Sequence, residues 1–127
     1  MQNNDNKFDL DLQFGQIIES RLQKILASKG KIEIKTERDV WKRTGNFAIE
    51  IECRGKPSGL TTTQADWWIH AFYNTNENEI EFAFLFQVKK LKKYIETNYT
   101  QQVYGGDDNL SKLVIIPISE QWKILTT

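Results

Sequence analysis

Residues 31–59, KIEIKTERDVWKRTGNFAIEIECRGKPSG, carry the pattern that decides the fold of this chain. Two runs of alternating residues, 31–39 and 47–53, predict two β-strands, and the loop around Thr44-Gly45-Asn46 joins them. A hairpin of these strands has an acidic face and an apolar face, and the apolar face is suited to cover by a helix. The stretch therefore predicts the centre of an α/β domain.

Carboxylates recur at every second position in both predicted strands. Side chains two positions apart share a face of a strand. The residues that share one face of the first strand are Glu33, Lys35, Glu37 and Asp39. Glu50 and Glu52 share a face of the second, so pairing of the strands would bring acids together near the end of the first strand. The alternative is a solvated face with cross-strand Lys–Glu pairs.

Composition limits the class of protein. The 127 residues fit a single domain, and 39% hydrophobic residues with seven Phe, four Trp and four Tyr indicate a folded core. The 17 basic and 17 acidic side chains balance, which counts mildly against a nucleic-acid binder. Cys53 and His70 are the sole residues of their types, which excludes an intrachain disulfide and cysteine- or histidine-rich metal clusters.

The rest of the chain predicts a compact domain with a mixed sheet flanked by helices. Residues 1–8 are polar and expected to be disordered. Apolar residues at three- and four-residue spacing predict an amphipathic helix over Asp11–Ser28. The further elements expected are a short helix or hydroxyl-rich turn at 58–65, a central strand (or, less well supported, a helix) at 66–73, a hairpin partner strand at 79–87, a helix at 88–97, a turn at 104–109, an edge strand with Pro117 at 112–118 and a final turn or short helix at 119–125.

Carboxylates on neighbouring strands are suited to a divalent cation. Mg²⁺ and Mn²⁺ prefer oxygen ligands, usually a few carboxylates with water and substrate phosphate. We expect Asp39 and Glu50 to be ligands, with the adjacent backbone carbonyl of Ile51. Glu52 would orient water, hold a second metal or act as base.

The order of these acids resembles the PD-(D/E)xK nuclease superfamily. The matching positions are Glu19 in the first helix, Asp39 at the end of a strand and Glu50-Ile51-Glu52 on the next. The run TGNFAIEIECRGKPSGLTTTQADWW is also similar to small phage and bacterial members. The resemblance implies a restriction-endonuclease-like fold, catalytic roles for these four acids, and Mg²⁺-dependent cleavage of DNA, more by endonuclease than exonuclease action, in phage DNA processing, repair or junction cleavage.

Two positions depart from the superfamily pattern. Glu52 stands where most members have lysine, so the positive charge must come from elsewhere, and Lys35 or Lys56 would supply it. Glu37 shares the predicted face of Asp39, so either acid fits the first-strand ligand. Glu19 fits equally a boundary residue paired with Arg21 or Lys24, and His70 fits a core histidine better than a base.

Contacts to DNA are expected from side chains that bind phosphates. These residues are Lys35, Lys42, Arg43, Lys56, Ser58, Thr61, Thr62, Lys89 and Lys90. Helix capping and a solvated helix face are the competing interpretations of the hydroxyls and lysines. A homodimer is one way to enlarge the small surface for duplex recognition.

Two alternatives to a nuclease remain open. One is a catalytically inactive nuclease-fold module that binds nucleic acid or protein, and the other is a small interaction protein with solvated acids. No apolar run approaches the about 20 residues of a membrane span, so we expect a protein without a membrane partner, located in the cytoplasm (of the host if phage-encoded).

Overall fold

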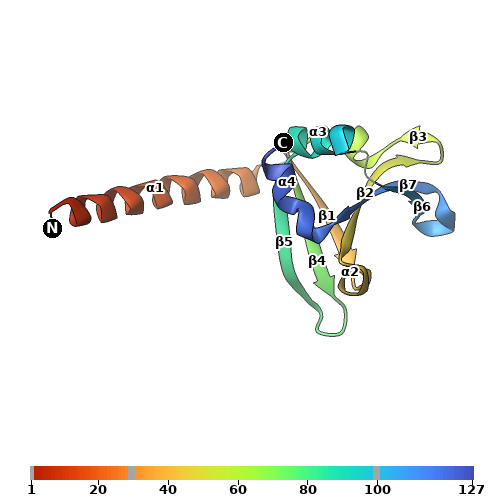
Figure 1. Ribbon diagram of the computed structural model, residues 1–127, viewed down its shortest axis with the longest axis horizontal. Coiled ribbons are helices and arrows are strands. Elements are labelled where there is room, and N and C mark those ends of the chain that lie inside the picture. Colours follow the sequence, from red (N-terminus) through yellow and green to blue (C-terminus); the bar gives the residue numbers. More distant parts are fainter. Residues whose placement is uncertain (1, 29–30, 99–100) are drawn as a thin grey trace.

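The protein is a mixed α/β chain of two β-sheets and several helices (Figure 1). The structure is a computed structural model that describes residues 2–28, 31–98 and 101–127. The first element is the long helix α1 (Gln2–Ala27). The elements that follow are β1 (Ile32–Arg38), α2 (Val40–Thr44), β2 (Asn46–Cys53), β3 (Lys56–Pro57), the 3-10 turn η1 (Gly59–Thr61), β4 (Trp67–Asn74), β5 (Glu79–Gln87), α3 (Val88–Asn98), β6 (Gln102–Gly105), η2 (Asp107–Asn109), β7 (Ser111–Pro117), η3 (Ile118–Glu120) and α4 (Gln121–Leu125).

The described strands form one sheet of order β1-β4-β5 and a second of order β3-β2-β7-β6. In the first sheet β4 lies in the centre, parallel to β1 and antiparallel to β5. The second sheet is antiparallel throughout. The run at 66–73 was expected to be a central strand because both of its faces are apolar, and β4 confirms this together with its hairpin to β5.

Aromatic side chains fill the space between the sheets. Phe72 on β4 stacks on Phe82 of β5 with ring centroids 4.4 Å apart, and Phe47 of β2 meets Phe72 edge-on at 5.9 Å. The buried residues that complete this core are Trp41, Ile49, Leu60, Trp68, Phe86, Val88, Leu91, Tyr94, Val114, Ile116 and Ile124. One face of α3 thus joins the core, as its amphipathic pattern predicts.

The predicted hairpin of residues 31–39 and 47–53 is wrong. Both strands exist, but they belong to different sheets, because β2 pairs with β7 and β1 pairs with β4. Helix α2 separates them, anchored by the buried indole of Trp41. Phe47 and Ile49 of β2 lie opposite Ile116 and Val114, so pairing with β7 creates a continuous apolar face that β1 could not offer.

The predicted edge position of the last strand is also wrong. β7 lies between β2 and β6, and the last two residues of β6, Tyr104 and Gly105, fall in the segment that was expected to be a turn. Pro117 is the last residue of β7 and lies opposite Asn46, beyond the part of β7 that pairs with β6. Because β6 does not extend as far as Pro117, the missing N–H of this proline breaks no hydrogen bond between β7 and β6.

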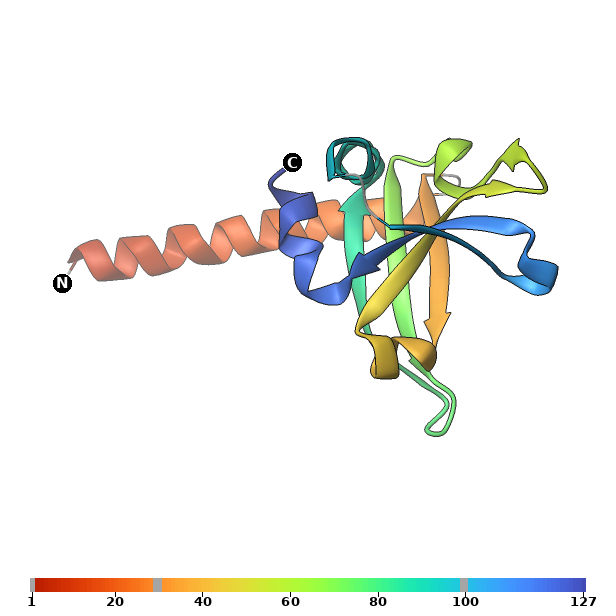
Figure 2. The same ribbon diagram turned by 45° about the vertical axis from the view of Figure 1, so that its right-hand side comes forward.

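Helix α1 extends away from the two sheets in both views (Figures 1 and 2). It begins at Gln2, so it includes most of the segment that was expected to be disordered. Most of its described large apolar side chains are exposed, among them Phe14, Ile17 and Leu22. The helix therefore has the predicted amphipathic pattern but does not cover a sheet of its own chain.

The core makes a direct prediction about stability. Phe72→Ala should lower the free energy of unfolding by about 3–5 kcal/mol, because Phe72 is fully buried and the substitution leaves a cavity among packed rings. Val40→Ala is the control, because Val40 is 56% exposed and should change the stability by less than about 0.5 kcal/mol. Denaturant unfolding of both variants checks this, and equal effects would contradict the assigned core.

Candidate functional site

A cavity of about 180 Å³ lies where the edge of β2 meets the β1-β4-β5 sheet. Two carboxylates from different sheets line it, Glu37 on β1 and Glu50 on β2. The other lining residues are Lys35, Thr36, Ala48, Trp68, His70 and Leu113. This volume is well below the about 300–1,000 Å³ of pockets for drug-sized ligands, so the cavity is suited to a small, charged group.

The carboxylate of Glu37 is held from two sides. Its Oε1 accepts a hydrogen bond from the backbone N–H of Ala48 at 2.6 Å and lies 3.0 Å from Nε2 of His70. His70 is buried, and its Nδ1 accepts a hydrogen bond from the indole N–H of Trp68 at 3.1 Å. The ring proton of His70 is therefore on Nε2 and is donated to Glu37. This confirms that His70 is a satisfied core histidine.

The carboxylate of Glu50 is held by two hydroxyls. Ser58 donates to Oε2 at 3.0 Å, and Ser111 of β7 donates to Oε1 at 2.6 Å. Gly59 allows the turn after β3 to approach β2 closely, because a Cβ at this position would lie 2.3 Å from the carbonyl oxygen of Glu50. Ser58, which was expected to bind phosphate, thus orients Glu50 instead.

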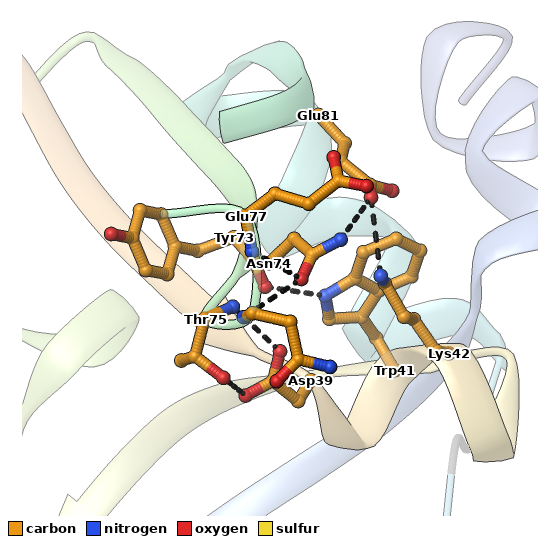
Figure 3. Close-up of polar contacts among 9 residues, drawn as sticks. Asp39, Trp41, Lys42, Tyr73, Asn74, Thr75, Glu77 and Glu81 are labelled. Atoms are coloured by element: carbon orange, nitrogen blue, oxygen red, sulfur yellow. Dashed lines mark hydrogen bonds and ion pairs between the residues drawn. The ribbon is translucent and has the colours of Figure 1, made fainter. Parts of the chain in front are cut away.

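Asp39 lies outside this cavity and does not join Glu50. Figure 3 shows its carboxylate turned toward Thr75 in the β4–β5 turn, where the Thr75 backbone N–H donates to Oδ1 at 2.9 Å and the Thr75 hydroxyl bonds Oδ2. The positive φ of 37° at Asp39 ends the alternation of β1 and swings the side chain out of line with Glu37. The prediction that Asp39 and Glu50 form a pair is therefore corrected to Glu37 and Glu50.

The residues around Asp39 connect α2 to the tip of the β4–β5 hairpin (Figure 3). The indole N–H of Trp41 donates to the carbonyl of Tyr73 at 3.2 Å. The carboxylate of Glu81 accepts from the amide of the buried Asn74 at 2.7 Å and pairs with Lys42 at 3.1 Å. The amide and ammonium donors lower the pKa of Glu81, and the Thr75 hydrogen bonds lower the pKa of Asp39. Asp39 and Glu81 thus stabilise the contact between α2 and the β4–β5 hairpin.

The structure places the predicted metal ligand Ile51 and the predicted catalytic residue Glu52 away from the cavity or in other contacts. The carbonyl of Ile51 already accepts the backbone N–H of Ser58 at 3.1 Å and the hydroxyl of Thr61 at 2.7 Å. The pairing of β2 with β7 shifts register between Glu50 and Glu52, so Glu52 lies opposite Lys112 and outside the cavity.

Glu19 does not reach the cavity either, because it is exposed on α1, which points away from the sheets. The prediction that Glu19 faces the site of the same chain is therefore wrong.

The predicted phosphate-binding residues are scattered, and several have other partners. Lys35 lines the cavity, whereas Lys42 pairs with Glu81 and Lys90 donates to the carbonyl of Leu125 at 2.9 Å. The hydroxyl of Thr62 lies 3.5 Å from the carbonyl of Gly59. Lys56, Arg43 and Lys89 are exposed, and Lys89 lines a separate hollow beside Asp66.

Sequence reasoning missed two residues of the site. Ser111 is 61 residues from Glu50 and carries no motif that links it to that acid. The sequence around Trp68 indicates a core residue, and nothing in it predicts the hydrogen bond from the indole of Trp68 to His70. Glu37 was identified from the sequence as an alternative to Asp39, because the two acids share a face of the predicted strand.

The donor set fits a cation that takes part of its coordination shell from water and phosphate. Within residues 2–28, 31–98 and 101–127, no three His, Cys, Asp or Glu side chains are grouped to hold a metal ion. Mg²⁺ commonly binds through one or two protein carboxylates with waters and substrate phosphate, and two carboxylates, Glu37 and Glu50, line this cavity. None of the described helices is long and apolar enough to span a membrane.

Comparisons of the chain with protein-family models, with curated proteins and with solved structures find no match.

Gly59 positions the Glu50 carboxylate, and its substitution tests this. Gly59→Ala should be more destabilising than Gly55→Ala. Both residues have positive φ, at 55° and 76°, so both substitutions carry a backbone cost of about 1 kcal/mol. Only at Gly59 does the new Cβ also clash with Glu50, since nothing lies within 4 Å at Gly55. Thermal unfolding compares the two, and equal shifts would contradict the close approach.

Asp39 should stabilise the fold in a pH-dependent way. Its pKa in the folded state is lowered below the usual 3.8 by the Thr75 hydrogen bonds, so its stabilisation is present above that value and is lost as pH falls through the lowered pKa. Wild type should therefore be more stable than Asp39→Asn near about pH 7, with the difference vanishing in acid. Unfolding curves across this range check it, and a difference that does not vary with pH would contradict the assignment.

Proposed function

We propose that this chain is a divalent-metal-dependent nuclease that hydrolyses phosphodiester bonds in DNA at the Glu37–Glu50 cavity. The observation that carries the proposal is that two carboxylates from different sheets line one small hollow together with a lysine. The resemblance of the TGN…E-x-E…SG run to the PD-(D/E)xK superfamily supports the same reaction. The restriction-endonuclease-like fold and endonuclease action belong to this proposal.

Glu37 and Glu50 would hold the cation. Both described contacts of Glu37 use Oε1, so we assign Oε2 to the ion. Each oxygen of Glu50 accepts one hydroxyl, and a carboxylate has about four lone-pair sites, so capacity remains. A bound Mg²⁺ or Mn²⁺ supplies a water of lowered pKa and neutralises charge on the phosphate.

The surrounding residues prepare the two acids for this task. The His70 and Ala48 contacts fix the rotamer of Glu37, and the two serines fix that of Glu50, so little reorganisation is needed when substrate arrives. Lys35 supplies the positive charge that the superfamily lysine provides, and it bonds a phosphate oxygen. The exposed lysines of α3, Lys89 and Lys93, contact the DNA backbone.

Cleavage of supercoiled plasmid DNA in Mg²⁺ or Mn²⁺ tests the proposal. Glu37→Gln and Glu50→Gln should each lower the rate by about 100-fold or more, because several kcal/mol of charge stabilisation depends on the ligands. Glu52→Gln is the matched control: it makes the same chemical change two residues from Glu50, outside the cavity, and should leave the rate within about threefold of wild type.

An equal loss in Glu52→Gln would contradict the assigned site. Wild type that fails to cut with any divalent metal would contradict the nuclease.

A second candidate is a nuclease-fold module that binds DNA without cutting it. The observations that favour it are the lysine position occupied by Glu52 and the internal hydrogen bonds already made by Glu37 and Glu50. Such a module would bind duplex DNA with metal-independent affinity, and Glu37→Gln would leave that affinity unchanged. Binding titrations beside the cleavage assay therefore separate the two functions.

A further inference from the structure

The outer face of the β1-β4-β5 sheet is mostly apolar and partly exposed to solvent. Residues paired across strands share a face, and Trp68, His70 and Phe72 point into the core, so their neighbours on β4 point outward. The outward rows are Ile32–Trp67–Gln87, Ile34–Ile69–Leu85, Thr36–Ala71–Ala83 and Arg38–Tyr73–Ile80. Ile34 and Ile80 are each 63% exposed. An exposed apolar patch of this kind marks an interaction surface.

Helix α1 presents a second exposed apolar surface. At 100° per residue, five of the six large apolar side chains that are exposed on the described part of α1 gather on one half of the helix circumference, and the sixth, Leu12, lies outside that half. The five are Leu10, Phe14, Ile17, Leu22 and Leu26. The opposite half carries Gln16, Ser20 and Gln23. We call the apolar half the α1 stripe. An isolated helix with one apolar half gains most of its stability by packing that half against another surface.

The two surfaces match in kind and in size. The 26 residues of α1 span about 39 Å, and an α-helix with its side chains is about 10–12 Å wide. Three strands about 4.8 Å apart make a face about 14 Å wide, and their seven to nine residues make it about 23–30 Å long. One helix therefore covers one sheet face, and each surface contributes roughly 350 Å².

We propose that the chain forms a dimer in which the α1 stripe of each copy packs on the outer β1-β4-β5 face of the other. The helix points away from its own sheets in both views, which directs the stripe to a second copy (Figures 1 and 2). The exchange is symmetric, as in most homodimers. This inference is independent of the proposed nuclease activity.

The buried area favours reciprocal exchange over a single contact. Two helix–sheet contacts involve four surfaces and bury on the order of 1,400 Å², within the about 1,200–2,000 Å² of stable interfaces. One contact alone would bury about half of that, which falls below the range. A second copy of the chain is the occupant that supplies both contacts at once.

Light scattering after size exclusion, with the full chain at rising concentration, tests the dimer. Wild type should have twice the 14.9 kDa chain mass. The helix variant Ile17→Glu/Leu22→Glu and the sheet variant Ile34→Glu should each raise the dissociation constant at least tenfold. The control Gln16→Glu/Gln23→Glu adds the same charge to the opposite side of α1 and should dimerise like wild type. Circular dichroism verifies that all four proteins are folded.

Mixing the two variants identifies the geometry. The helix variant keeps an intact sheet face and the sheet variant keeps an intact α1 stripe, so a mixed dimer regains one of two contacts and should form more readily than either variant alone. A wild type that is monomeric at every concentration would overturn the proposal, whether α1 is free or packs on its own sheet. So would a dimer that Ile34→Glu leaves intact, since that result indicates helix–helix pairing.

Discussion

The carboxylate of Glu37 joins three strands at the point where the two sheets meet. It accepts the N–H of Ala48 from β2 and contacts His70 on β4, while its own backbone belongs to β1. The indole of Trp68 completes the chain of hydrogen bonds from the other side of His70. Because His70 is buried, loss of the acceptor would leave polar groups unsatisfied at about 1–3 kcal/mol. The same acid that closes the seam between the sheets also lines the cavity in which we propose that a cation binds.

Much of the fold follows from local patterns in the sequence. The apolar run at 66–73 is a central strand, 79–87 is its hairpin partner, and the stripe of Val88, Leu91 and Tyr94 places α3 on the core. The alternating pattern of residues did not predict which strand pairs with β2. A period of two says which residues of β2 share a face, but β1 and β7 both offer ladders, and the fit of Phe47 to Ile116 decided between them.

The sequence predicted that acids of two strands approach one another, but it did not decide which acids do so or which residues hold them. Glu37 and Asp39 share a face of an ideal strand, and the positive φ at Asp39 that separates them is a property of the folded turn into α2. Glu50 was identified from its motif, whereas its partner Ser111 arrives through the pairing of distant strands.

The central claim is that Glu37 and Glu50 share a divalent cation. Anomalous diffraction from a crystal of the protein soaked in Mn²⁺ measures this most directly. The account predicts an anomalous peak within ligand distance of both carboxylates, at about 2.0–2.3 Å, and no peak there in a Glu50→Gln crystal treated identically. A well-soaked crystal with an empty cavity, or with manganese bound at Asp39 instead, would contradict it.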